Sequence, residues 1–275
     1  MKWITRERAR VDRIACPWLI ARFIDPAPEL LFVPDGLVMA TAQREHAVPY
    51  DVPGVELGHH GARCSFDAFV GRYELDDPGL LALAAIVRGA DTDQRDLTPE
   101  SAGLYAAATG FQAISRDDHD NMARQFPLYD AFYAFCRARA GAPPPRVLFV
   151  CLHGAAKSVV AAAHFRRLAR ERGLGVAAVA VGVEPDPGLS PETVRGLAGD
   201  GLHPAPPLPR LVTLHDLRTA SRIVSFGCDV PAGAGQPVER WDDVPAVRLG
   251  YEAARARIVE RLGPLVDDLA ARPAR

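Results

Sequence analysis

The chain has 275 residues, 48% hydrophobic and 24% charged, which is typical of a soluble globular protein with one large or two ordinary domains. The formal net charge of −2 gives no reason to expect nucleic acid or an acidic surface as a partner. No apolar run reaches the roughly 18 residues that cross a membrane, and no secretory signal is visible. Because the five cysteines lack the spacing of a disulfide framework, we expect a cytoplasmic protein with reduced thiols.

The first 140 residues predict a mixed but helix-rich domain. Apolar residues recur at helical spacing over residues 11–24, and the Asp-Pro pair at 25–26 ends that helix. Prolines at 49 and 53 leave the next apolar stretch irregular, with room for an edge strand. We expect further helices at 37–45, 65–73, 79–88, 99–113 and 119–139, a strand at 30–33, and the irregular segment at 48–57.

Polar residues gather at several points of this half and are candidates for a metal site. Glutamate, histidine and aspartate from separate loops could converge on a divalent transition metal or an oxyanion. Each histidine alone has a second interpretation, as a surface or hydrogen-bonded residue. The predicted convergent set consists of Glu56, His59, Asp91 and His119.

Several short sequence motifs in the same half resemble those of the chromate-resistance domain of bacterial chromate-responsive regulators. The resemblance runs from about Trp3 to Cys136 and implies chromate-linked resistance or sensing. Its phrases are VDRIACPWLI at 11–20, ELGH at 56–59, CSFD at 64–67, IVRGADT at 86–92 and YDA at 129–131.

Three consecutive prolines at 143–145 mark the boundary between two parts of the sequence that differ in their pattern of expected helices and strands. Prolines cannot continue a helix and favour an extended spacer. We therefore predict a domain at 1–140, a Pro-rich linker at 141–145, and a second domain at 146–275.

Strands alternate with helices after this boundary. We expect strands at 146–150, 176–183 and 223–226, and helices at 158–173, 190–197, 213–220 and 249–269. This alternation predicts a doubly wound α/β domain with a parallel sheet. Ligands of such sheets bind at the carboxyl ends of the strands, and Cys151 and Cys228 both follow such ends.

The segment from Cys151 to Ser158, here called the Cys151 loop, joins a buried strand to a helix. Small residues there turn backbone N–H groups inward, and with the helix N-terminus they form a nest for an anion and favour a thiolate. Lys157 adds positive charge at the rim, and Ser158 can donate to the sulfur. A buried structural cysteine before an ordinary turn is the alternative. The cradle residues are Leu152, His153, Gly154, Ala155 and Ala156.

The loop resembles the signature of low-molecular-weight tyrosine phosphatases and the related arsenate reductases, which is Cys, five residues, Arg, then Ser or Thr. The resemblance covers nearly all of residues 146–270 and implies that fold, with Cys151 as the nucleophile. Lys157 replaces the family arginine, and an ammonium lacks the two-pronged grip of a guanidinium. Gly154 replaces the usual asparagine, but both residues tolerate a positive φ.

The same resemblance implies two further roles. Cys228 stands where arsenate reductases carry a second thiol, which attacks the first after product forms; thioredoxin or a small thiol would then act as reductant. Its alternative role is that of a small core residue. Asp243 lies where the family keeps its general acid, although Val244 separates it from the proline, and a solvated turn is the alternative.

Three hypotheses for the function follow from these patterns. The first is a heavy-oxyanion resistance protein, for chromate or arsenate, that reduces or binds its substrate through the Cys151 loop. The second is a non-catalytic oxyanion sensor with a degraded phosphatase loop. The third is a metal-dependent enzyme in the N-terminal half. None of them calls for nucleic acid or a membrane as partner.

Overall fold

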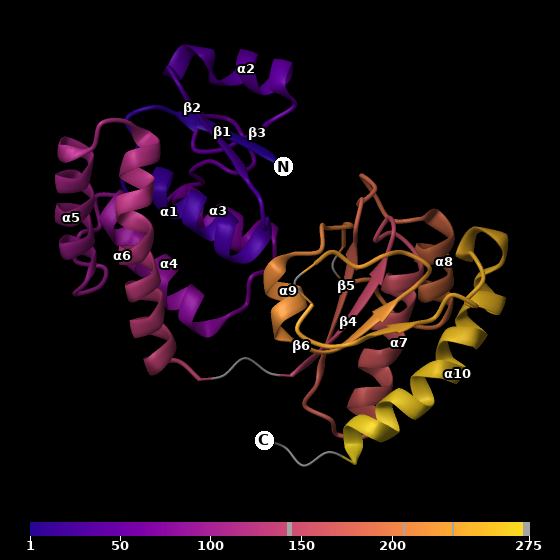
Figure 1. Cartoon of the computed structure of the whole chain (residues 1–275). Coiled ribbons are helices and arrows are strands. Elements are labelled where there is room, and N and C mark those ends of the chain that lie inside the picture. The colour runs from indigo at the N-terminus through magenta and orange to yellow at the C-terminus, as the bar shows by residue number, and fades with distance from the viewer. Residues whose placement is uncertain (142–144, 206, 233, 272–275) are drawn as a thin grey trace. The chain divides into compact units, whose positions relative to one another are not determined.

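The computed structural model describes residues 1–141, 145–205, 207–232 and 234–271. It separates into two compact units, Met1–Pro143 and Pro144–Arg275, which are drawn in Figure 1 and described one at a time below. Most of the linker predicted at 141–145 lies outside the described residues. No helix among the described residues is both long and apolar enough to span a membrane.

A three-stranded parallel sheet lies at the start of the N-terminal unit. The central strand β1 (Lys2–Arg6) pairs with β2 (Glu29–Val33) on one side and with β3 (Val48–Pro49) on the other. The strands predicted near residues 30 and 48 are confirmed. Strand β1 was not predicted, because its buried Trp-Ile-Thr core is only three residues long and is flanked by Lys2 and Arg6.

Helices make up most of the rest of this unit, as predicted. Helix α1 begins at Asp12 and continues into a π-helical turn, and Trp18 from α1 packs at the centre of the core beside Tyr129. Asp77 caps α4 by accepting a hydrogen bond from Leu80 N–H. The helices are α1 (Asp12–Leu19), η1 (Ile20–Ile24), η2 (Asp35–Leu37), α2 (Val38–Glu45), α3 (Ser65–Arg72), α4 (Pro78–Asp91), α5 (Ser101–Ile114) and α6 (Asp118–Arg139).

The C-terminal unit is built on a four-stranded parallel sheet in the order β5-β4-β6-β7, which confirms the predicted α/β class. Cys151 lies opposite Gly182 and Val150 opposite Ser225, so the loops after these strands open at one edge. Strand β7 was not predicted. The strands are β4 (Arg146–Cys151), β5 (Ala177–Gly182), β6 (Ala220–Ser225) and β7 (Val238–Arg240).

Helices cover both faces of this sheet (Figure 1). Alternate side chains of β4 face opposite ways: Phe149 and Cys151 pack with α7 and α10, whereas Leu148 and Val150 pack on the α9 side. Cys151 is therefore on the α7 face. The helices are α7 (Lys157–Glu171), α8 (Pro191–Gly199), α9 (Leu214–Thr219), η3 (Val247–Leu249) and α10 (Tyr251–Ala270).

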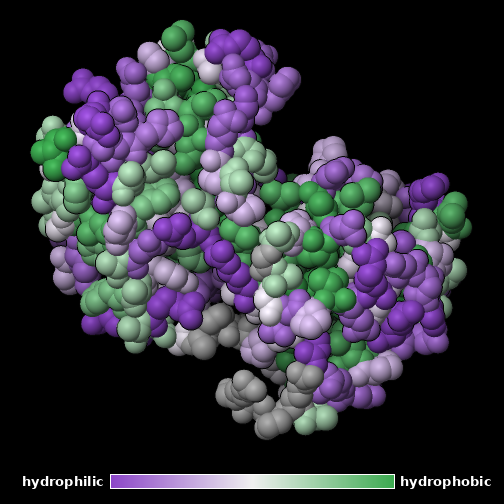
Figure 2. Space-filling model, viewed as in Figure 1, coloured by the Kyte–Doolittle hydropathy of each residue, from purple (hydrophilic) through white to green (hydrophobic). Residues whose placement is uncertain are grey.

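The visible surface of each unit mixes polar and apolar residues (Figure 2). Large exposed apolar side chains, such as Met39, Ile114 and Leu249, occur in both units. Scattered apolar residues of this kind are normal on a folded protein and do not mark a binding surface.

Candidate functional sites

The Cys151 loop passes very close to the neighbouring strand β5. Gly154 has a φ of 61°, and a Cβ atom there would lie 2.7 Å from the backbone nitrogen of Gly182. A side chain is thus opposed both by the left-handed backbone and by the close approach. Glycine at this position keeps the loop tight against the sheet.

The peptide carbonyls of this loop point away from its interior. Four of them accept hydrogen bonds from the segment after β5. Because C=O and N–H point in opposite directions within one planar peptide, the following N–H groups face inward. In the described structure, no N–H from Leu152 to Ala156 donates to a backbone carbonyl. The bonds are Val183 N to Cys151 O (3.2 Å), Glu184 N to Leu152 O (2.8 Å), Asp186 N to His153 O (3.1 Å) and Ser190 N to Ala155 O (3.0 Å).

Cys151 ends β4 with its thiol directed toward the start of α7. Its Sγ lies 3.1 Å from Oγ of Ser158, which is fully buried in the first turn of that helix. A hydroxyl at this distance can donate to a thiolate, and the positive end of the helix dipole lies beside both groups. This geometry is the one expected from the sequence, in which the Ser158 hydroxyl donates to the sulfur.

Lys157 lies at the rim of the loop and contacts a protein acceptor. Its ammonium donates to the backbone carbonyl of Val244 at 2.6 Å. The contact fixes the loop to the segment around residues 241–245. This contact also uses one of the three N–H donors of the ammonium. Lys157 therefore has fewer N–H donors left for a bound anion than an arginine would have.

Asp243 does not suit the role of general acid that the resemblance implied. Arg261 and Arg257 each donate to its carboxylate, and these hydrogen bonds lower the pKa of Asp243 to about 2. A carboxylate this acidic is ionised near neutral pH and holds no proton to deliver. Asp243 acts as an anchor for α10, to which both arginines belong.

Cys228 packs on the face of the sheet opposite Cys151. Its Sγ lies 3.8 Å from the carbonyl of Val150 and 3.7 Å from Oγ of Ser225, in the cluster on the α9 side. Burial raises the pKa of the Cys228 thiol, which reduces its thiolate fraction. All five cysteines are free thiols. The Cys151 charge also raises the pKa of Cys228, so the two sulfurs lie near each other, and the core-residue interpretation rests on the burial and the apolar neighbours of Cys228.

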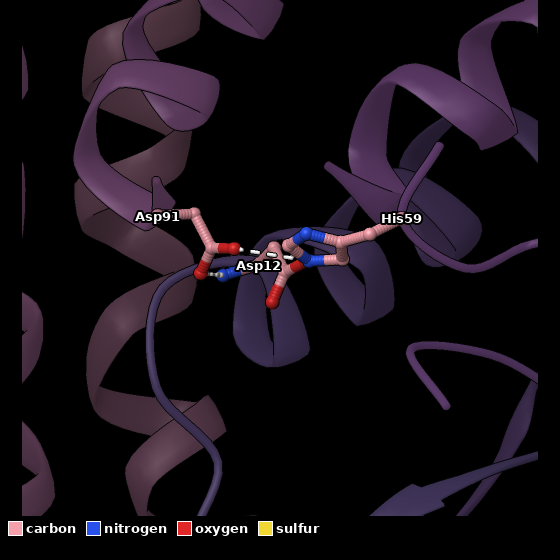
Figure 3. Close-up of side chains that lie close together, drawn as sticks. All are labelled: Asp12, His59 and Asp91. Atoms are coloured by element: carbon pink, nitrogen blue, oxygen red, sulfur yellow. Dashed lines mark hydrogen bonds and ion pairs between the residues drawn. The ribbon is translucent and has the colours of Figure 1, made fainter. Parts of the chain in front are cut away.

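The N-terminal unit gathers three aspartates around one imidazole, and this set is here called the His59 cluster. Asp12 begins α1, Asp91 ends α4, and His59 comes from the loop before α3 (Figure 3). Nε2 of His59 lies 3.0 Å from Asp12 and 3.2 Å from Asp91. Asp51 completes the cluster, with its Oδ1 at 3.3 Å from the same nitrogen.

Burial and crowding govern the charges of this cluster. Burial, then the charges of Asp91 and Asp51, raise the pKa of Asp12 to about 8. Hydrogen bonds to Asp12, Asp51 and Asp91 raise the pKa of His59 to about 12, so its ring is protonated when no other cation is present. Asp51 differs because Arg6 and Arg13 also pair with it, at 3.0 and 3.1 Å.

Only half of the predicted metal set converges. His59 and Asp91 meet, but Glu56 is 71% exposed and pairs with Arg72, and the His119 ring packs edge-on against Phe32. The expectation for Glu56 and His119 is therefore wrong: a nearby donor, Arg72, pairs with Glu56, and an aromatic ring packs against His119. Asp12 was missing from the predicted set. Its signal in the sequence is a carboxylate that stands, next to Arg13, on a helix whose remaining residues are apolar.

Comparisons with known proteins agree with the resemblance in this unit. Residues 3–136 match the family model described as ChrB, C-terminal domain. Protein ChrB of Cupriavidus metallidurans is 32% identical over 130 residues, which are 47% of this chain and 36% of that protein. The chain thus spans about a third of the relative's length. The resemblance of the N-terminal unit to a chromate-resistance domain is confirmed.

Solved structures similar to this chain align over about half of its length. YfkJ from Bacillus subtilis is 23% identical with a TM-score of 0.42, over 48% of this chain and 99% of its own. A thioredoxin-dependent arsenate reductase from Corynebacterium glutamicum is 18% identical (TM-score 0.39, 60% and 93% covered). A low-molecular-weight phosphotyrosine phosphatase from Vibrio cholerae is 19% identical (TM-score 0.40, 47% and 99%). The fold class of the C-terminal unit follows from its own strand order and parallel register.

Proposed function

We propose that the protein serves resistance to heavy oxyanions such as chromate or arsenate, and that it binds a tetrahedral oxyanion in the Cys151 loop. The observation that carries this proposal is the orientation of the loop peptides. Their carbonyls are engaged outward by the segment after β5, which leaves consecutive N–H groups directed inward at the start of α7. The match of the N-terminal unit to a ChrB domain supplies the context of chromate resistance.

The side chains at the loop define what the bound anion meets. The N–H groups would hold the oxygen atoms, and Cys151 would be the nucleophile or soft ligand at the floor of the nest. Ser158, 3.1 Å from the sulfur, stabilises its anionic form. Lys157 contributes positive charge from the rim while it holds the Val244 carbonyl.

Three features favour binding over turnover. Lys157 provides no bidentate grip on a transferring group. Asp243 holds no proton near neutral pH. The Cys228 thiol packs in the core on the α9 side and its pKa is raised, so little of it is thiolate that could attack and release a reduced product. We therefore favour a binding or sensing role over reduction by thioredoxin or a small thiol, the second candidate.

Calorimetry on the full chain tests the proposal. Arsenate and phosphate should each bind with one site per chain. Cys151→Ser should weaken arsenate more than phosphate, because a thiolate displaces hydroxide from arsenate, with an As–S bond formed and an As–O bond broken, far more readily than from phosphate. A coupled assay with thioredoxin or glutathione should show no sustained reduction of arsenate. Absence of anion binding would refute the proposal, and sustained thiol-dependent reduction would replace binding with catalysis.

A further inference from the structure

The hydrogen bonding of the His59 cluster does not balance. Nε2 of an imidazolium carries one hydrogen and makes one good hydrogen bond. Oxygen atoms of Asp12, Asp51 and Asp91 nevertheless surround this nitrogen at 3.0, 3.3 and 3.2 Å. Two of these oxygens have a second donor, since Ser65 gives its N–H to Asp12 at 3.3 Å and its hydroxyl to Asp51 at 3.2 Å. The Asp91 oxygen that faces the ring has no such second donor among the described residues.

The acids of the cluster differ in their cationic partners. Asp51 is compensated by Arg6 and Arg13. Within the described ranges, His59 is the only cationic side chain that forms an ion pair with Asp12 or Asp91. The Asp12 side chain is 3% exposed, and a buried carboxylate is costly unless it is paired or bound to a metal. One imidazolium thus faces two carboxyl groups at the edge of a buried site, and ionising both of them is costly unless a further cation joins them.

A further polar atom beside the cluster lacks a partner. The Tyr50 hydroxyl is fully buried and has no hydrogen bond among the described residues. Burial, then the charges of Cys16, Asp51 and Asp12, raise the pKa of Tyr50, so it remains a neutral hydroxyl next to these acids.

We propose that Asp12, His59 and Asp91 bind one divalent first-row transition metal ion. One ligand atom from each of the three residues lies within 4.8 Å of the others. Two ligands bound to one ion at about 2.1 Å in a tetrahedral site are about 3.4 Å apart, close to the His59–Asp12 and His59–Asp91 distances of 3.0 and 3.2 Å. Metal binding requires the neutral imidazole, so the ion takes the place of the proton on Nε2.

The surroundings suit a site that is held firmly yet remains accessible. Asp12 and Asp91 stand at the ends of helices α1 and α4, and Asp12 N–H bonds to the Asp91 carboxylate at 3.3 Å (Figure 3). His59 is 43% exposed, which gives an ion a route from solvent. Three protein ligands leave at least one coordination position open, as in catalytic rather than structural zinc sites.

The donor set narrows the choice of ion. One imidazole with two carboxylates suits Zn²⁺ or Mn²⁺, whereas Mg²⁺ and Ca²⁺ prefer oxygen ligands throughout. We therefore use Zn²⁺ and Mn²⁺ as probes and expect Mg²⁺ to bind much more weakly. The site is independent of the Cys151 loop, because all three ligands belong to the N-terminal unit.

Titration of the chelator-treated full chain tests the site. Calorimetry with Zn²⁺ or Mn²⁺ should show one ion per chain, and His59→Ala should lower the affinity at least about a hundredfold, since a direct ligand matters more than the outer partners that give ten- to hundredfold losses. His60→Ala is the matched control: the adjacent histidine bonds to the Glu56 carbonyl and should leave the affinity unchanged. No binding near one ion per chain, or an equal loss in both variants, would overturn the proposal.

A second readout separates a metal site from a structural ion-pair network. Asp91→Asn keeps the oxygen that accepts from Asp12 N–H and removes one negative charge. For a metal site, this variant should melt at or above the wild-type temperature without metal and should lose the rise in melting temperature that Mn²⁺ gives the wild type. If Asp91→Asn melts lower and Mn²⁺ does not raise the wild-type melting temperature, the cluster is a structural network and the proposal fails.

Discussion

The Cys151 loop and the His59 cluster are suited to ligands of opposite charge, and they are built from different parts of the chain. The loop is one short run of chain whose inward groups are backbone N–H donors, suited to an anion. The cluster joins side chains that lie as far as 79 residues apart, and its excess of carboxylates suits a cation. A site made by contiguous backbone is encoded locally, whereas a site made by distant side chains exists only once the unit has folded.

The largest loss of stability is expected from a substitution at Gly154, where the loop backbone has a positive φ and lies against Gly182. Gly154→Ala should destabilise the C-terminal unit by about 2–5 kcal/mol, the sum of left-handed strain and a clash with Gly182, and should abolish anion binding. Gly173→Ala is the control, because that glycine has a φ of 65° with open space around it and should cost only about 1–2 kcal/mol. Urea unfolding measures both. Equal losses would mean that the close approach is unimportant.

Metal binding should stabilise the N-terminal unit and leave the stability of the C-terminal unit unchanged. At a hundredfold excess over the dissociation constant, Mn²⁺ should stabilise the N-terminal unit by about 2.7 kcal/mol, and chelator should reverse this. Hydrogen exchange followed by mass spectrometry should show slower exchange at the start of α1 and the end of α4, with no change in residues 151–158. Slower exchange in the Cys151 loop instead would mean that the metal binds at the thiol.

Lys157→Arg should raise the affinity of the Cys151 loop for arsenate. A guanidinium can bind two oxygens at once, so we expect arsenate affinity to rise about fivefold, or about 1 kcal/mol. Lys157→Met serves as control, since it removes the contact to the Val244 carbonyl without offering a new cation. Calorimetry compares the three proteins. An arginine variant no tighter than wild type would show that the rim side chain does not reach the anion.

Cys228→Ala should have the smallest effect on anion binding. The residue packs with Leu148 and Val150 on the other face of the sheet, so its loss should change arsenate affinity by less than about twofold and cost about 1 kcal/mol of stability. Peptide mass spectrometry after exposure to arsenate and reductant should find no Cys151–Cys228 link. A substantial yield of that disulfide would restore the reductase hypothesis.

The sequence indicates the Cys151 loop because strand, small residues, Lys157 and Ser158 follow in order, and each lies where this order predicts. It does not indicate the partner of the Lys157 ammonium, since the Val244 carbonyl lies 87 residues away. It also does not indicate the face on which Cys228 packs. That depends on how the chain turns after β6, which the strand pattern alone does not specify.

The His59 cluster was predicted only in part for the same physical reason. His59 and Asp91 stand out as polar residues near element ends, but so do Glu56 and His119, which other partners satisfy. Asp12 lies on the helix predicted from apolar spacing at 11–24, and its carboxylate is a candidate only because α4 brings Asp91 beside it. Side-chain convergence depends on tertiary packing, which helical periodicity does not encode.

Protection of Cys151 from alkylation tests the central claim most directly. The full chain is treated with iodoacetamide, with and without arsenate or phosphate, and peptide mass spectrometry follows each cysteine. If the loop holds an oxyanion, either anion should slow alkylation of Cys151 at saturating concentration, while Cys136 in the N-terminal unit alkylates at an unchanged rate. Alkylation of Cys151 at the same rate with and without anion would contradict the claim that the Cys151 loop is an oxyanion site.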